Sequence, residues 1–179
     1  MIMSFKSRLA LAFGVNTVSQ ANVNRRVAIL LAVFGGANAF GPLSEAAKAA
    51  DRPFIKVARN AGCGCCLLWG KHLEANGFRL EMTERRDLAA YKAQLGVPED
   101  LASCHTGIID GYVIEGHVPA DAIKRLLAAK PKAIGLAVPG MPSGSPGMEG
   151  GTPEVYEVVL FGKSERSSFG RWRGDRQIG

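Results

Sequence analysis

Three of the four cysteines in this chain of 179 residues occupy the four positions from Cys63 to Cys66, in the order Cys-Gly-Cys-Cys. The fourth cysteine is Cys104. Two uses fit sulfur at this density: a thiolate site for a soft metal ion, or a dithiol redox centre in which Cys63 and Cys66 form a Cys-x-x-Cys pair. We favour the metal site. In either case the chain must fold so that this segment is presented for reaction.

The first 49 residues have the features of an export signal. Arg25 and Arg26 precede an apolar run at residues 27–34, and the small-residue segment Ala47-Lys48-Ala49 resembles a cleavage site. The apolar run is too short to span a membrane, which takes ~20 residues. We therefore expect residues 1–49 to be a signal peptide and the mature chain to begin near Ala50, without a stable membrane span.

The charge of the chain is unevenly distributed. Residues 1–49 contain five basic residues and one acidic residue, so the leader accounts for most of the net charge of +6. A second basic stretch covers residues 163–179, which we expect to be a flexible, solvated tail. The body of the chain is close to neutral, and it lacks the basic face that nucleic-acid binding requires.

Residues 50–162 have the pattern of one small α/β domain. We expect strands at residues 54–58, 78–83, 105–109, 112–115 and 155–161, and helices at residues 66–76, 88–95 and 119–130. Residues 131–153 are rich in Gly and Pro and predict a long ordered loop. The order β-α-β-α-β-β-α, with the cysteines between the first strand and the first helix, is that of a thioredoxin-like domain. A helix N-terminus at this point favours thiolate over thiol.

The dipeptide Asp110-Gly111 predicts a two-residue hairpin turn. Counting outward from such a turn brings Cys104 opposite His117, on one face of the hairpin, and points His105 to the other face. Cys104 and His117 can then complete a site with the cysteines of the first helix. A bulge or a longer turn would exchange His117 for His105.

Two methionines, Met141 and Met148, lie in the Gly/Pro-rich segment. Their thioether sulfur suits Cu(I), and this part of the chain has few apolar neighbours for them to pack against. The alternative is that they anchor the loop to the domain, because Met readily fills irregular gaps. We weigh the two interpretations evenly.

The chain resembles the small exported copper-resistance proteins called CopG over residues 54–161. The resemblance is carried by Cys63–Cys66, Trp69–Glu74, Ser103–Thr106, Gly111-Tyr112, Glu115–Pro119 and Pro139–Met148. It implies a periplasmic, thioredoxin-like, Cys-rich protein that binds copper and either interconverts Cu(I) and Cu(II) or sequesters copper. Its implied partners are copper ions and other periplasmic copper-handling proteins. Whether it acts as a copper oxidoreductase is left open.

As a hypothesis, thiolates at the Cys63–Cys66 run bind Cu(I) and share it through bridging sulfurs in a cluster of several ions. The expected metal ligands are Cys63, Cys65, Cys66, Cys104, His117, Met141 and Met148. Mixed sulfur and nitrogen ligation accommodates both oxidation states of copper. Zinc is an alternative, since three Cys and one His form a common zinc set, but its usual spacing is two separated pairs.

Other interpretations of these residues stay open. Four cysteines in an exported protein can form two structural disulfides, although a bridge between the adjacent Cys65 and Cys66 would be strained. The protein can instead be a thiol-disulfide oxidoreductase using Cys63 and Cys66, or a copper chaperone without redox activity. We expect His72 and His105 to be structural and Glu115 to lie on the surface of its strand.

Overall fold

The computed structural model describes residues 51–179, and the predicted signal peptide at residues 1–49 lies outside them. The chain begins with β1 (Phe54–Arg59), α2 (Gly64–Ala75), β2 (Arg79–Glu84), α3 (Leu88–Gln94), β3 (His105–Ile109), β4 (Tyr112–Glu115) and α4 (Ala120–Ala129). It continues with β5 (Gly135–Ala137), β6 (Val155–Phe161), β7 (Arg166–Arg173) and β8 (Arg176–Gln177). The expected order β-α-β-α-β-β-α is therefore present up to α4, with one short 3-10 turn before β3.

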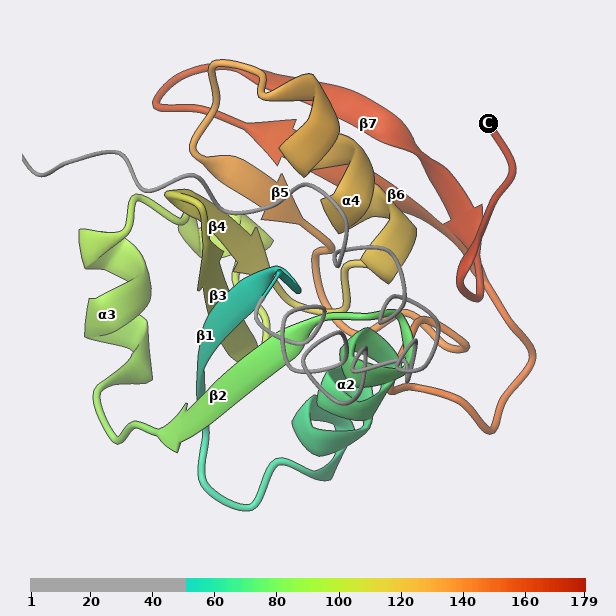
Figure 1. The fold of residues 1–179 in the computed structure, drawn as a ribbon, viewed down its shortest axis with the longest axis horizontal. Helices are drawn as coiled ribbons and strands as arrows, with labels where there is room; N and C mark the ends of the chain where they lie inside the picture. Colours follow the sequence, from blue (N-terminus) through green and yellow to red (C-terminus); the bar gives the residue numbers. More distant parts are fainter. Residues whose placement is uncertain (1–50) are drawn as a thin grey trace, which may run out of the picture. The chain divides into compact units, whose positions relative to one another are not determined.

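The strands of the described residues form one mixed sheet in the order β2-β1-β3-β4-β5-β6-β7-β8 (Figure 1). Strand β1 runs parallel to β2 and antiparallel to β3, and β4 runs parallel to β5. The last residue of β1, Arg59, pairs with His105, the first residue of β3. The segment that follows β1 therefore lies beside the segment that precedes β3. This brings Cys63 and Cys104 to the same end of these two strands.

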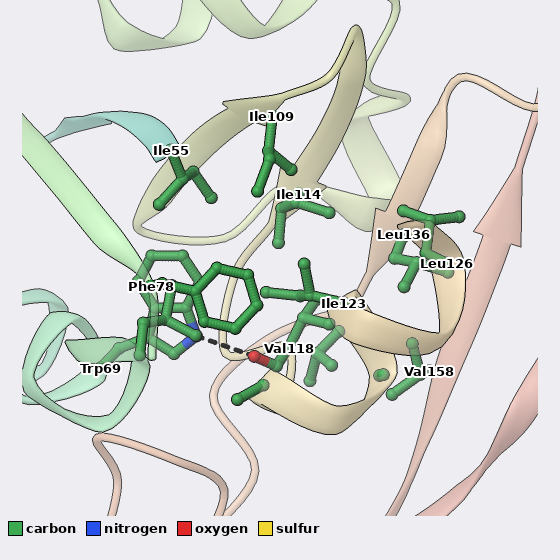
Figure 2. Packing of buried hydrophobic residues seen from close by; sticks show 14 of the residues in the cluster. Ile55, Trp69, Phe78, Ile109, Ile114, Val118, Ile123, Leu126, Leu136 and Val158 are labelled. Atoms are coloured by element: carbon green, nitrogen blue, oxygen red, sulfur yellow. Dashed lines mark hydrogen bonds between the residues drawn. The ribbon is translucent and has the colours of Figure 1, made fainter. Parts of the chain in front are cut away.

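Helices α2 and α4 pack against one face of the sheet and bury its main hydrophobic core (Figure 2). Trp69 and Leu73 of α2 meet Ile123 and Leu126 of α4 over sheet residues that include Ile55. The indole Nε1–H of Trp69 donates to the carbonyl oxygen of Val118 at 2.9 Å. This bond satisfies the polar atom of a buried aromatic side chain and ties α2 to the segment that enters α4. A smaller cluster formed by Val97, Leu101, Val113, Ala137 and Phe161 covers the opposite face.

The prediction of a frayed basic tail is wrong. Strand β7 pairs with β6 from Arg166 to Arg173, and its Trp172 is buried in the main core. The guanidinium of Arg125, on α4, lies 4.0 Å from the centroid of the Phe169 ring and 5.6 Å from that of Trp172. The arginines of this strand are exposed, whereas Phe169 and Gly170 are half-buried and Trp172 is buried, so high local charge concealed the pattern.

The predicted loop at residues 131–153 also contains a strand, β5, that its sequence does not indicate. Strand β5 has only three residues, too few for an alternating pattern to be recognised. It lies between β4 and β6, and a Cβ at Gly135 would come within 1.8 Å of the Val113 carbonyl oxygen. A glycine is therefore required where β5 approaches β4. Within the described part of the chain, none of the helices is long and apolar enough to cross a membrane.

Candidate metal centre

Residues 60–66 follow β1 and include the first turn of α2, and we call them the cysteine loop. Cys63 is the N-cap of α2, and Cys65 and Cys66 lie in its first turn. The first N–H groups of a helix have no partner within the helix, and its N-terminus carries a partial positive charge. The prediction that the cysteines lie at the junction of the first strand and first helix is confirmed, with the helix beginning two residues earlier than expected. Cys63 and Cys65 are partly exposed, whereas Cys66 is buried.

The sulfur atoms of all four cysteines lie within 4.8 Å of one another. Cys63 and Cys66 form a disulfide, and within residues 51–179 Cys65 and Cys104 are free. The Sγ of Cys104 lies 3.6 Å from that of Cys65 and 3.5 Å from that of Cys66. Two thiolates that bind one tetrahedral ion at about 2.3 Å are about 3.8 Å apart. The spacing of the sulfurs therefore suits shared metal ions once the disulfide is reduced.

The β3–β4 hairpin has the predicted two-residue turn, with Ile109 opposite Tyr112. Beyond its open end, the Nε2 atom of His117 lies 3.4 Å from the Sγ of Cys104. The other ring nitrogen of His117, Nδ1, is 2.8 Å from the carbonyl oxygen of Pro146. A carbonyl only accepts, so Nδ1 carries the proton and Nε2 presents its lone pair towards Cys104. Metal-ligating histidines commonly have this arrangement.

The prediction that His105 points away from Cys104 is wrong. Its Nδ1 lies 3.4 Å from the Sγ of Cys104, so both histidines are next to this thiol. The alternation of faces applies within strands, but Cys104 precedes β3 and His117 follows Gly116, whose φ of +71° turns the chain after β4. The ring of His105 packs 4.3 Å from Trp69 and 5.1 Å from His117, measured between centroids. We call Cys104, His105, Gly116 and His117 the hairpin mouth.

Burial controls the protonation of the hairpin mouth. It lowers the pKa of both His105 and His117, because a charged imidazolium loses its hydration there. Burial also raises the pKa of the Cys104 thiol to about 11, assisted by the neighbouring Cys65. Near neutral pH the imidazoles are therefore neutral and can act as ligands, while the thiol carries a proton that a bound metal must displace.

The Gly/Pro-rich loop lies directly on the start of α2. A Cβ at Gly147 would come within 2.6 Å of the Cys65 carbonyl oxygen and 2.7 Å of the Trp69 nitrogen. The same loop supplies the Pro146 carbonyl that orients His117. Met148 is half-buried in it and Met141 is 54% exposed. The loop therefore covers the centre, and ligation by the two methionines stays a prediction.

Glu115 is fully buried, which corrects the prediction that it lies on the strand surface. Its Oε1 accepts from the backbone N–H of Ser103 at 2.7 Å and forms an ion pair with Lys92 of α3. Its Oε2 accepts from the hydroxyl of Thr106 at 2.6 Å. This network fixes the residue that precedes Cys104. The sequence signal was weak, because a lysine in a short helix usually faces solvent.

His72 is a member of neither group of clustered ligand atoms among the described residues. Its Nε2 accepts from the backbone N–H of Ala120 at 3.1 Å, at the first residue of α4. This bond satisfies a free donor at the helix N-terminus, and His72 serves in place of an N-cap side chain.

Comparison with known proteins points to one family. A family model described as "Protein of unknown function, DUF411" matches residues 101–148, which include Cys104, both histidines of the hairpin mouth and both loop methionines. The solved structure "Copper resistance protein copG", Form 1, is 48% identical over 69% of this chain and 100% of that chain, with a TM-score of 0.65. Form 2 is 47% identical over 68% of this chain and 99% of that chain, with a TM-score of 0.64. No curated protein sequence matches the chain.

Proposed function

Because the chain belongs to the family of the copper-resistance protein CopG, we propose that it is a periplasmic protein that binds copper and interconverts Cu(I) and Cu(II) during copper detoxification. The observation that carries this proposal is the gathering of four sulfurs and two imidazole rings around Cys104. The proposed ligands are Cys63, Cys65, Cys66, Cys104 and His117, with Met141 and Met148 from the loop above.

The donor set favours copper over zinc. Soft thiolate and thioether ligands select Cu(I), and imidazole ligands suit Cu(II), so a mixed set accommodates both oxidation states. Structural zinc sites usually separate their ligands into two pairs, whereas three of these cysteines lie in four consecutive residues. Because Cys65 and Cys66 are adjacent, their sulfurs are better suited to bridging several ions than to chelating one.

The residues around the cysteines favour thiolates and shield part of the proposed site from water. The N-terminus of α2 favours the charged form of the cysteines that it carries. His105 and His117 are fully buried, and the Gly/Pro-rich loop lies over the first turn of α2. The arrangement of β1, α2, β2, β3, β4 and α4 supports our proposal that the fold is thioredoxin-like.

Anaerobic titration of the reduced mature chain, residues 50–179, tests the proposal. We expect tight binding of more than one Cu(I) per chain, protection of the thiols from alkylation and weaker binding of Zn(II). The Cys104→Ser variant should bind fewer Cu(I) ions, because Cys104 is the sulfur that contacts both the cysteine loop and the histidines. Preferential, stoichiometric binding of Zn(II) would contradict the proposal.

The Cys63–Cys66 disulfide also supports a second candidate, a thiol-disulfide oxidoreductase. The Sγ of Cys104 lies 3.5 Å from the Sγ of Cys66. The thiolate of Cys104 is therefore placed to attack the Cys63–Cys66 disulfide. Pro98 is not adjacent to the start of β3, where enzymes of the thioredoxin type carry their proline, which counts against this candidate. Catalysed reduction of a disulfide-bonded protein substrate, combined with weak copper binding, would favour the oxidoreductase.

A further inference from the structure

We propose that the hairpin mouth is a copper site in its own right, formed by Cys104, His105 and His117, which binds one ion while Cys63 and Cys66 remain joined as a disulfide. The proposal rests on the proposed function only for the identity of the natural metal. It adds His105 to the ligands and separates the centre into two parts that share the Cys104 sulfur.

The distances between the three ligand atoms support a single shared ion. Both His105 Nδ1 and His117 Nε2 lie 3.4 Å from the Cys104 Sγ, and all three residues belong to one group of ligand atoms within 4.8 Å. Thiolate and imidazole ligands on one tetrahedral ion are about 3.6 Å apart. The side chains can therefore close around an ion with shifts of a few tenths of an ångström.

The hairpin mouth does not depend on the cysteine loop for its construction. Cys104 precedes β3, His105 is its first residue, and His117 follows β4. The two strands pair from Thr106 opposite Glu115 to Ile109 opposite Tyr112. The backbone N–H of Gly116 donates to the His105 carbonyl at 3.1 Å and closes the open end of the hairpin. Oxidation of Cys63 and Cys66 removes two thiolates from the other part of the centre but leaves these three ligands in place.

A second observation is the burial of the His105 ring. Its side chain is 0% exposed, and among residues 51–179 no hydrogen-bond partner is present for its Nε2. Buried polar atoms without a partner are rare in native structures. Packing alone would be better served by an apolar residue against Trp69. A metal ion held by Nδ1, the ring nitrogen that faces Cys104, would explain why a histidine occupies this position, whereas Nε2 lies on the other side of the ring and is not a ligand.

The donor set also indicates which chemistry the hairpin mouth would support. One thiolate and two imidazoles are the ligands of mononuclear copper sites that transfer single electrons, often with a distant methionine as a fourth ligand. The cysteine loop, in contrast, supplies only sulfur. The two parts of the centre would therefore hold copper differently, with a polynuclear thiolate site in the reduced protein and one mixed-ligand ion in the disulfide form.

The test uses Co(II) as the probe, because Co(II) does not oxidise thiols and its absorption spectrum reports both thiolate ligation and tetrahedral geometry. The mature chain with the Cys63–Cys66 disulfide is prepared, and thiol counting verifies that two thiols remain. We expect one Co(II) per chain with a thiolate-to-metal absorption band. X-ray absorption of the complex should show one sulfur and at least two nitrogen ligands.

Variants assign the ligands. Cys104→Ser should abolish the thiolate band, and His105→Gln and His117→Gln should each raise the Kd for Co(II) at least about tenfold, as expected when a group that holds the metal is lost. His72→Gln is the matched control, because His72 belongs to neither group of ligand atoms, and it should keep the band and the affinity. Circular dichroism and thermal unfolding of each variant identify any that fail to fold.

Two results would overturn the proposal: absence of Co(II) binding by the disulfide form, or unchanged affinity in folded His105→Gln. If a histidine variant does not fold, the nitrogen count from X-ray absorption of the wild-type complex decides instead, and a sulfur-only shell refutes the site. Failure of the proposed copper function is seen separately, in the Cu(I) titration of the fully reduced protein, so the two failures are distinguishable.

Discussion

The cysteine loop lies partly open to solvent, whereas the hairpin mouth is enclosed. Cys63 and Cys65 are partly exposed and the next two residues of α2, Leu67 and Leu68, are 45% and 48% exposed. His105 and His117 are completely buried. Both regions contribute candidate ligand atoms to one cluster, but the loop brings its sulfurs together by sequence proximity, and the hairpin mouth assembles its atoms by strand pairing and packing. The loop is therefore expected to tolerate changes that the hairpin mouth does not.

The largest effect is expected from removing the carboxylate behind the hairpin mouth. Glu115→Ala would leave the buried amine of Lys92 without its ion partner and the Ser103 N–H without its acceptor. Breaking a buried pair from one side costs about 3–5 kcal/mol. We expect a loss of this size in the free energy of unfolding, measured with urea.

The double variant Lys92→Met/Glu115→Leu provides the control for this change, because it removes both charges and keeps apolar volume. It should recover much of the lost stability. A loss of unfolding free energy below about 1 kcal/mol in Glu115→Ala would mean that the network does not stabilise the hairpin mouth. The hairpin mouth would then tolerate substitution as well as the cysteine loop does.

A smaller loss is expected where the Gly/Pro-rich loop meets the cysteine loop. In Gly147→Ala the new Cβ would collide with the Cys65 carbonyl, at a φ of +87° that disfavours any side chain. Overpacking of this kind costs about 1–3 kcal/mol. Gly140→Ala is the matched control, because its φ of +69° is similar and no atom of the described residues lies within 4 Å of its Cβ position. Equal losses of unfolding free energy in the two variants would show that the loop does not rest on α2.

His72 gives a pH-dependent effect on stability. Burial lowers its pKa from the ordinary value of 6.5, opposed by Asp175, Glu149 and Asp121 and assisted by Lys124. The unfolded chain therefore binds the proton more readily than the folded chain, so stability is complete above pH 6.5 and falls as the pH decreases below it. Protonation also removes the acceptor of the Ala120 N–H.

Urea unfolding of the metal-free protein between pH 7.5 and 5 measures this effect. We expect the free energy of unfolding to fall less in His72→Gln than in the wild type over that range, because glutamine takes up no proton. Identical pH profiles for the two proteins would exclude a role for His72 in stabilising α4, which begins just after the hairpin mouth.

The smallest effect is expected on the exposed side of α2, just after the cysteine loop. Leu68 is 48% exposed, so Leu68→Gln should change the free energy of unfolding by less than about 0.5 kcal/mol. Leu73, further along the same helix, is completely buried, and Leu73→Ala should cost about 2–5 kcal/mol. Both values come from the same denaturation experiment. A cost above about 1 kcal/mol for Leu68→Gln would show that the side of α2 next to the cysteine loop is packed and not open to solvent.

Local patterns were sufficient for much of the fold. The Asp110-Gly111 turn and the alternating residues around it predicted the β3–β4 register, and the boundaries of β6 were predicted correctly. The strands β5 and β7 were not predicted. Strand β5 is too short for a periodic pattern. Strand β7 has exposed arginines on both sides of Trp172, whose burial depends on α4 and β6.

The sequence by itself determined that three sulfurs lie at a helix start and that Cys104 and His117 approach each other, because close spacing and hairpin register are local properties of the chain. Only the tertiary structure decided that His105 joins them and that Glu115 is buried against Lys92. Those placements depend on the turn of the backbone at Gly116 and on the side chains that α2 and α3 bring to the two faces of the sheet. Packing between distant segments, which no local pattern encodes, therefore completes the centre.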